Sequence, residues 1–261
     1  MSKKQDGPKI LIVDIETRPM EAWIWQLYDI TVPLNMIKKQ GNMLSWSAIW
    51  YGEPDSKLMY EEVKHNKTDD DEVLVTKLHK LMNEADIIVG QNSDRFDLKY
   101  ANTRFVKHGL HKIKPHKTRD TMKIAKKHFN LPSYSLEFMG EFFEVKHRKM
   151  KDRKFPGFEL WKACMAGIKA AWVEMKKYNG YDVLTTRDIF EILIPWDQGL
   201  NYSVYRDNEG SPCCDKPHLV KRGYRYTDSG VKNQIYFCKG CNGWSTGKEN
   251  LNSNKQTLKK A

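Results

Sequence analysis

The sequence predicts an α/β domain with a mixed sheet flanked by helices, and the order of its segments is what indicates this fold. Strands come first: the apolar segment 9–15 is followed by segments 43–51 and 57–60, which share a turn and are expected to form a meander with it. An amphipathic helix after Asp71 and a short apolar strand at 85–89 then begin βα alternation. Helical patterns follow at 96–108, 118–128, 135–143 and 168–193, the last interrupted near Gly180. This succession is typical of an α/β domain.

The composition is that of a globular protein without a membrane-spanning segment. The chain has 261 residues, of which 40% are hydrophobic and 30% are charged. No apolar run approaches the roughly 20 residues that a membrane span requires. The first apolar run, residues 10–13, ends at Asp14 and is too short for the core of a signal peptide. We therefore expect a cytoplasmic protein with no membrane partner.

The net charge of +11 is unevenly distributed along the chain. Residues 107–154 contain 14 Lys and Arg against 5 Asp and Glu, and residues 201–261 contain 11 against 5. The remainder has 19 basic and 23 acidic residues. A solvated, lysine-rich surface is one explanation of the basic segments. The other is an acidic metal site flanked by basic surface that receives a polyanion, which predicts nucleic acid as the partner.

The first strand ends in two acidic residues, Asp14 and Glu16. Because side chains alternate along a strand, both carboxylates point to the same face and can bind one cation. An apolar strand has no structural reason to end in two parallel acids, which repel each other unless a metal neutralises them.

Two further segments carry candidate catalytic residues. Asp97 follows a strand and a turn, in the first turn of a helix, where the helix dipole alone would also explain an acid. Tyr178 and Asp182 lie four residues apart on the last predicted helix and therefore share a face. Each pattern is weak alone, and their order along the chain gives them weight.

These three segments resemble the motifs of the DEDD superfamily of 3′–5′ exonucleases. The first motif, Asp-x-Glu, corresponds to residues 14–16, and the second, Asn-x-x-x-Phe/Tyr-Asp, to residues 92–97. The third has the form Tyr-x-x-x-Asp at residues 178–182, and Lys177 stands where the alternative form has histidine, so the resemblance is to the tyrosine branch (DEDDy, DnaQ-like). It implies a ribonuclease H-like fold with a five-stranded mixed sheet. The wider sequence is similar to stand-alone phage exonucleases, which would place the protein in the host cytoplasm.

The resemblance also implies a two-metal-ion mechanism. Asp14, Glu16 and Asp182 would hold one Mg²⁺ or Mn²⁺, and Asp14 would bridge to a second, which Asp97 supports. Tyr178 would orient the attacking water, since an ordinary pKa of about 10 makes tyrosine a poor base at neutral pH.

Three residues beside these motifs are candidates for contacting the terminal nucleotide: Thr17, Asn92 and Phe96. For Phe96 the sequence leaves a second interpretation open, a place in the hydrophobic core. Cys164 stands apart from the other cysteines and is predicted to be a small buried residue.

Four of the five cysteines are clustered near the C-terminus, where the sequence resembles a zinc ribbon. Cys238 and Cys241 form a Cys-x-Gly-Cys knuckle, and hairpin strands are expected on its N-terminal side. A ribbon usually has Cys-x-x-Cys in its first half, whereas this chain has the adjacent pair Cys213 and Cys214, with His218 as an alternative ligand. We favour the four cysteines as ligands of one structural Zn²⁺, with a metal-free ribbon as the alternative.

The predicted organisation is an exonuclease domain at 1–200, a zinc ribbon at 201–250 and a disordered basic tail at 251–261. The predicted function is 3′–5′ hydrolysis of DNA, at single-stranded 3′ ends, with a replication or repair protein as a further partner. Two alternatives stay open: an exoribonuclease acting on RNA, and a non-catalytic nucleic-acid-binding adaptor that keeps the fold.

Overall fold

The chain is described here by a computed structural model that covers residues 7–148, 153–206, 210–214 and 218–252. It forms two compact units, Lys9–Phe190 and Glu191–Ala261, the second together with Met1–Pro8. Residues 149–152 and the predicted tail beyond residue 252 lie outside the described residues.

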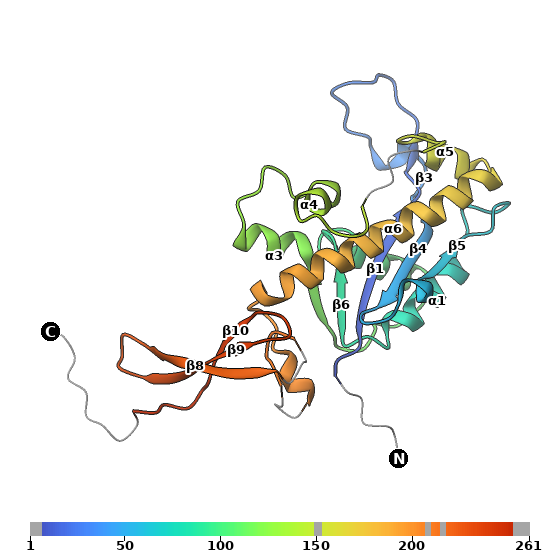
Figure 1. The fold of residues 1–261 in the computed structure, drawn as a ribbon. Helices are drawn as coiled ribbons and strands as arrows, with labels where there is room; N and C mark the ends of the chain where they lie inside the picture. Colours follow the sequence, from blue (N-terminus) through green and yellow to red (C-terminus); the bar gives the residue numbers. More distant parts are fainter. Residues whose placement is uncertain (1–6, 149–152, 207–209, 215–217, 253–261) are drawn as a thin grey trace, which may run out of the picture. The chain divides into compact units, whose positions relative to one another are not determined.

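The larger unit is built on a mixed five-stranded sheet, which confirms the predicted fold class (Figure 1). The strand order is β5-β4-β1-β6-β7. The central strand β1 pairs antiparallel with β4 and parallel with β6, and β6 pairs parallel with β7. The strands are β1 (Ile10–Thr17), β4 (Met43–Trp50), β5 (Met59–Glu62), β6 (Ile87–Gly90) and β7 (Lys117–Asp120).

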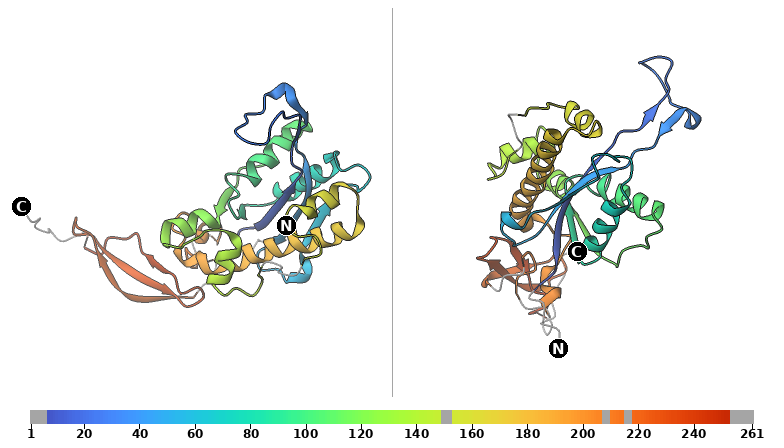
Figure 2. Two further views of the ribbon diagram at one scale, coloured as in Figure 1. Left: turned by 90° about the horizontal axis from the view of Figure 1, so that it is seen from above. Right: turned by 90° about the vertical axis from the view of Figure 1, so that its right-hand side faces the viewer.

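Helices cover both faces of this sheet. α1 and α2 lie on one face, and the long helix α6 lies with α4 on the other (Figures 1 and 2). The buried residues Leu11, Val13 and Ile15 of β1 belong to the main core cluster, whereas Asp14 and Glu16 alternate with them. The helices are α1 (Glu72–Met82), α2 (Asp97–Lys107), α3 (Thr121–His128), α4 (Leu136–Phe142), α5 (Glu159–Met165) and α6 (Lys169–Leu193).

Two predicted helices differ from the structure. The helix predicted from residue 118 begins only at Thr121, because the polar sequence Lys117–Asp120 pairs with β6 as strand β7. The predicted interruption of the last helix at Gly180 is wrong, since α6 is continuous. A Cβ at Gly180 would lie 2.8 Å from Leu58 Cδ2, so this glycine permits a close approach of the helix to its neighbours.

Between β1 and β4 the chain makes an excursion of residues 18–42, a segment without a predicted helix or strand. It contains β2 (Glu21–Ala22), the 3₁₀ turn η1 (Leu34–Met36) and β3 (Ile37–Lys39), and it projects beyond the sheet (Figures 1 and 2). We call it the arm. Its large side chains are unusually exposed: Met20, Trp23, Ile24, Trp25, Leu27, Tyr28, Ile30 and Leu34.

The smaller unit contains a three-stranded antiparallel sheet in the order β10-β9-β8. The predicted hairpin corresponds to β8 (Leu219–Tyr226) and β9 (Lys232–Cys238), to which β10 (Trp244–Thr246) adds a third strand. The 3₁₀ turns η3 (Ile194–Trp196) and η4 (Tyr202–Arg206) precede this sheet in the chain. A further 3₁₀ turn, η2 (Asp55–Lys57), belongs to the larger unit, where it precedes β5. Among the described helices of both units, none has the length and apolar character needed to cross a membrane.

Candidate active site and cysteine cluster

Three predicted carboxylates meet where the end of β1 faces α6. Asp14, Glu16 and Asp182 each offer an oxygen, and these oxygens lie within 4.8 Å of one another. Asp14 and Glu16 are opposite Ser47 and Ser45 of β4, so small side chains flank the acids on the sheet. Strand alternation and one turn of α6 therefore bring together residues that are up to 168 positions apart in the sequence.

Asn179 holds α6 against β1 at this point. Its amide Nδ2 donates to Asp14 Oδ2 at 2.6 Å and to the Asp14 carbonyl oxygen at 3.3 Å. The Ser45 hydroxyl donates to Asn179 Oδ1 at 3.4 Å, and Asn179 is fully buried. Asn179 lies beside Tyr178 but is not part of any of the three sequence motifs. We infer that it positions Asp14 relative to Asp182.

Asp97 approaches the same site from the start of α2. Its Oδ1 accepts a hydrogen bond of 3.2 Å from the backbone N–H of Ile15, the residue between the two acids of β1. The group of three carboxylates does not include Asp97, which is buried beside it. Burial raises the pKa of Asp97 to about 7, against the lowering effect of its backbone hydrogen bonds.

The carboxylates destabilise one another's charged forms. Burial, followed by the charges of Asp97, Glu16 and Asp182, raises the pKa of Asp14 well above its usual range. Burial and the charges of Asp182 and Asp97 do the same to Glu16, and a hydrogen bond from Trp161 opposes the shift. Buried like charges of this kind are stable at neutral pH when a cation lies among them. An oxygen-only donor set fits Mg²⁺ or Mn²⁺.

Tyr178 contacts an aromatic ring and a guanidinium group. The Trp161 ring of α5 meets it edge-on at 5.6 Å between ring centroids, and Arg153 Cζ lies 5.0 Å from the centre of the tyrosine ring. Burial and then the charges of Asp182, Glu16 and Asp14 raise the pKa of Tyr178 far above its usual value. The phenol is therefore protonated at neutral pH. Arg153 and Trp161 were also missed in the sequence, because neither lies within a recognisable motif.

Of the three predicted nucleotide-contacting residues, Thr17 and Phe96 are sequence neighbours of Glu16 and Asp97, and Asn92 lies in the turn before α2. Thr17 ends β1 directly after Glu16. Asn92 has a φ of +56°, which asparagine tolerates better than most residues, and its N–H donates to Asp120 Oδ1 at 3.0 Å. Phe96 is 44% exposed and stacks on Tyr100 at 5.7 Å, so it is not a core residue.

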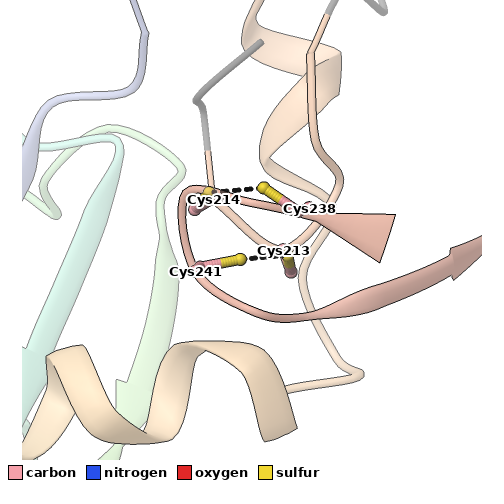
Figure 3. Close-up of side chains that lie close together, drawn as sticks. All are labelled: Cys213, Cys214, Cys238 and Cys241. Carbon is pink, nitrogen blue, oxygen red and sulfur yellow. Dashed lines mark hydrogen bonds between the residues drawn. The ribbon is translucent and has the colours of Figure 1, made fainter. Parts of the chain in front are cut away.

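The four C-terminal cysteines form a second cluster of potential ligands (Figure 3). Their sulfur atoms lie within 4.8 Å of one another, with Cys213 Sγ 2.6 Å from Cys241 Sγ and Cys214 Sγ 3.6 Å from Cys238 Sγ. Both halves of the motif therefore contribute, including the adjacent pair that departs from the usual ribbon spacing. Four thiolates around one point fit a structural Zn²⁺.

His218 is not part of this cluster. Its backbone carbonyl accepts from the N–H of Lys239, and the four-sulfur group forms without its side chain. Gly243 is part of the knuckle: its carbonyl accepts from Cys238 N–H, and a Cβ built on it would lie 2.5 Å from Cys213 Sγ. Glycine is thus required where the backbone passes the sulfurs. Cys164 is buried in the other unit, as predicted.

The metal-free protein is expected to lose stability as the pH rises from about 4 to 8. The folded-state pKa values of Asp14, Glu16 and Asp97 are raised, so protonation favours the folded state below the unfolded pKa of about 4. That contribution disappears as the pH passes the folded value, about 7 for Asp97. Urea unfolding without divalent metal at pH 5, 6.5 and 8 measures this trend. Saturating Mg²⁺ should reverse it, and a metal-free stability that increases with pH would contradict it.

Replacing Asn179 by leucine is expected to raise the Mg²⁺ concentration needed for half-maximal activity by about 10- to 100-fold, the usual cost of losing a group that orients a metal ligand. Leucine has a similar branched shape, although it is larger, and it removes the donor that lowers the pKa of Asp14. Asn42→Leu is the matched control, because Asn42 is also buried and donates from its amide to two main-chain carbonyls. Equal shifts in metal dependence for both variants would mean that Asn179 acts only on stability.

Comparison with known proteins agrees with this architecture. A model of the RNase H superfamily matches residues 37–194, which include Asp97, Tyr178 and Asp182 but not β1. The fold is similar to that of a family B DNA polymerase from the hyperthermophilic archaeon Pyrobaculum calidifontis, with a TM-score of 0.54 and 18% sequence identity. This similarity covers 72% of the chain and 25% of the polymerase, so the chain spans about a quarter of that protein's length. None of the curated proteins matches the chain.

At 18% identity the similarity to the polymerase concerns the fold alone. The family model carries more weight, because it matches well over half of the chain and spans the sheet from β4 onward together with α6. The chain belongs to the RNase H superfamily.

Proposed function

We propose that this protein is a metal-dependent 3′–5′ exonuclease of the tyrosine branch of the DEDD superfamily, acting on DNA. The observation that carries the proposal is the convergence of Asp14, Glu16 and Asp182 within 4.8 Å, beside buried Asp97 and half-buried Tyr178. Membership of the RNase H superfamily supports a nuclease. The 3′–5′ direction and DNA as substrate come from the motif resemblance, as does the link to phage enzymes.

Asp14, Glu16 and Asp182 would hold the first cation, and Asp14 with Asp97 the second. Bound Mg²⁺ or Mn²⁺ would lower the pKa of water and stabilise negative charge on the scissile phosphate. The protonated Tyr178 hydroxyl can donate a hydrogen bond that orients the attacking water. It cannot act as the base that takes the water's proton, because the phenol would first have to ionise, and its raised pKa prevents this at neutral pH. This assigns Tyr178 an orienting role.

Arg153 is a further candidate at the site, since its Cζ lies 5.0 Å from the centre of the Tyr178 ring. Its positive charge lowers the pKa values of both Glu16 and Tyr178, against the larger raising effect of burial. Within the described part of the chain its buried Nη1 has no hydrogen-bond partner, which leaves a donor for a phosphate oxygen. Thr17, Asn92 and Phe96 would contact the terminal nucleotide, with the exposed Phe96 ring offered for stacking.

The C-terminal unit is proposed to be a zinc ribbon, with Cys213, Cys214, Cys238 and Cys241 as ligands. The unit boundary at Phe190/Glu191 supports a separate module there, about ten residues before the boundary predicted from sequence. A replication or repair protein is a further proposed partner.

The test is a cleavage assay with 5′- and 3′-labelled single- and double-stranded DNA and RNA, in Mg²⁺, in Mn²⁺ and without either ion. A 5′-labelled strand should shorten progressively into a ladder, and a 3′-labelled strand should release mononucleotide at once. An Asp14→Asn protein purified in parallel controls for contaminating nucleases, and Asp86→Asn, an ion-paired acid at the start of β6, controls for the substitution itself.

Each alternative has its own outcome. Mononucleotide released first from a 5′ label would overturn the polarity, and preference for RNA would make the protein an exoribonuclease. Binding without cleavage of any substrate would identify a non-catalytic adaptor.

A further inference from the structure

One face of the ribbon sheet combines exposed tyrosines with basic side chains. Residues that pair across antiparallel strands point to the same face. Lys221 pairs with Tyr236, Tyr224 with Gln234, and Tyr226 with Lys232. Residues two apart on one strand also point to the same face, as Tyr224 and Tyr226 do on β8 and residues 232, 234 and 236 do on β9. The three pairs therefore share one side of the sheet. We call it the tyrosine face.

The tyrosine face is accessible. Tyr224 is 49% and Tyr226 63% exposed, and β8 is exposed from Lys221 to its end. The register shift between Lys221 and Tyr224 occurs at Gly223, whose φ of +96° favours glycine, and Gln234 Nε2 donates to its carbonyl at 2.7 Å. This bulge restores the alternation, so that Lys221 and Tyr224 remain on the same side.

The side chains of the tyrosine face are arranged around one cation. Lys232 Nζ lies 4.0 Å from the ring centre of Tyr224 and 5.8 Å from that of Tyr226. A lysine over two rings positions a positive charge beside two flat apolar surfaces. The strands β8 and β9 contain four basic residues, Lys221, Arg222, Arg225 and Lys232, and no acidic residue. Among the described residues none of these four forms an ion pair.

We infer that the tyrosine face binds a single-stranded nucleic acid, with bases stacked on Tyr224 and Tyr226 and phosphates beside Lys221 and Lys232. Exposed aromatic rings between unpaired cations are the surface that unpaired bases on a phosphate backbone require. Protein interfaces, by contrast, are depleted of lysine. Two residues of a strand span about 6.7 Å, close to twice the 3.4 Å rise per nucleotide, so the tyrosines can contact alternate bases.

This inference goes beyond the proposed catalytic site, because it assigns strand binding to a separate unit that contains none of the proposed catalytic residues. Stacking is tolerant of base sequence, and a duplex offers its bases only at its ends. The binding should therefore favour single strands and depend weakly on sequence.

The test measures binding of a fluorescent single-stranded oligonucleotide by anisotropy, in the full-length Asp14→Asn protein, so that the probe is not degraded. Zinc is retained and no chelator is added. Replacing Tyr224 and Tyr226 together by alanine should weaken binding by about 30-fold or more, since each stacked base contributes roughly 1–3 kcal/mol. Replacing both by phenylalanine keeps the rings and should restore affinity to within about threefold.

A charge-matched pair separates the two faces of the sheet. Lys232→Gln should reduce the slope of affinity against salt by about one ion, whereas Arg225→Gln removes a charge from the opposite face and should change it less. Zinc content of each variant reports whether the ribbon is folded. Unchanged affinity of a zinc-loaded double-alanine variant would overturn the inference, as would equal losses in the alanine and phenylalanine variants.

Failure of strand binding by the tyrosine face can be distinguished from failure of the proposed nuclease activity. If the inference is correct but the protein is no nuclease, the oligonucleotide binds through the tyrosine face and no cleavage occurs with Asp14 present. If only the nuclease assignment is correct, cleavage proceeds and the double-alanine variant leaves the KM for long strands unchanged.

Discussion

Asp14→Asn is expected to slow cleavage severely and at the same time to stabilise the metal-free protein. The rate should fall by on the order of 10³-fold, as when one pre-organised electrostatic contact to the transition state is lost. Without metal, however, the half-buried carboxylate of Asp14 lies beside three other acids, and desolvation and their charges raise its pKa. An amide of the same shape removes that repulsion and still accepts the Asn179 hydrogen bond.

The measurement is thermal unfolding with and without 5–10 mM Mg²⁺ (roughly the range that saturates weak sites), beside the cleavage rate. Without metal the variant should unfold at a higher temperature than the wild type, by about 2–4 °C for each kcal/mol of repulsion relieved. With Mg²⁺ the order should reverse, because only the wild type gains stability by binding the ion. A variant that is less stable in both conditions would show that Asp14 is simply a packed polar residue. Asp86→Asn should show neither effect.

Gly243→Ala is expected to remove zinc from the C-terminal unit. A Cβ at this position would lie 2.5 Å from Cys213 Sγ and 3.2 Å from Cys241 Sγ, both closer than van der Waals contact allows. The backbone or the sulfurs must move, and a tetrahedral site with Zn–S bonds of about 2.3 Å tolerates little movement. Because zinc binding supplies on the order of 10 kcal/mol to the folding of such modules, the unit should unfold with loss of the ion.

Gly247→Ala is the matched control, since its added Cβ would meet Tyr236 Cε2 at an ordinary 3.4 Å. Zinc content by atomic absorption and the near-ultraviolet circular dichroism of the ribbon aromatics should change only in the Gly243 variant. Stoichiometric zinc in Gly243→Ala, with wild-type unfolding, would exclude the four-cysteine site. Activity on a dinucleotide should persist in both variants if catalysis requires only the larger unit.

The parts of the fold that the sequence predicted are those in which local pattern and tertiary role agree. The alternation that exposes Asp14 and Glu16 on one face of β1 is a property of the strand itself, and the spacing of Tyr178 and Asp182 is a property of the helix. Strand β7 was missed because Lys117–Asp120 carries no apolar alternation, and it forms by pairing with the buried β6. Gly180 was read as a break because its partner, Leu58, is remote in sequence.

Site residues were predicted where their role follows from local spacing, and they were missed where it depends on residues remote in the sequence. By sequence Asn179 belongs only to the Asn-Gly pair at the predicted interruption, and its role depends on Asp14, 165 positions earlier. Arg153 and Trp161 contact Tyr178 only after α5 packs beside α6. The cysteine cluster was predictable because its ligand spacing is local within each half, although the participation of the adjacent pair could be decided only by geometry.

The arm is a segment that could be removed without disturbing the sheet. Its two ends are already joined, since Arg18 N–H donates to the carbonyl of Asn42 at 2.7 Å and Thr17 pairs with Met43. Strands β1 and β4 are thus neighbours that a tight turn of two residues could connect directly. Shortening the connection also lowers the entropy lost when its ends are brought together. Residues 19–41 are therefore a natural insertion point, where a segment can be excised or exchanged for another while the register that sets Asp14 against Ser47 is preserved.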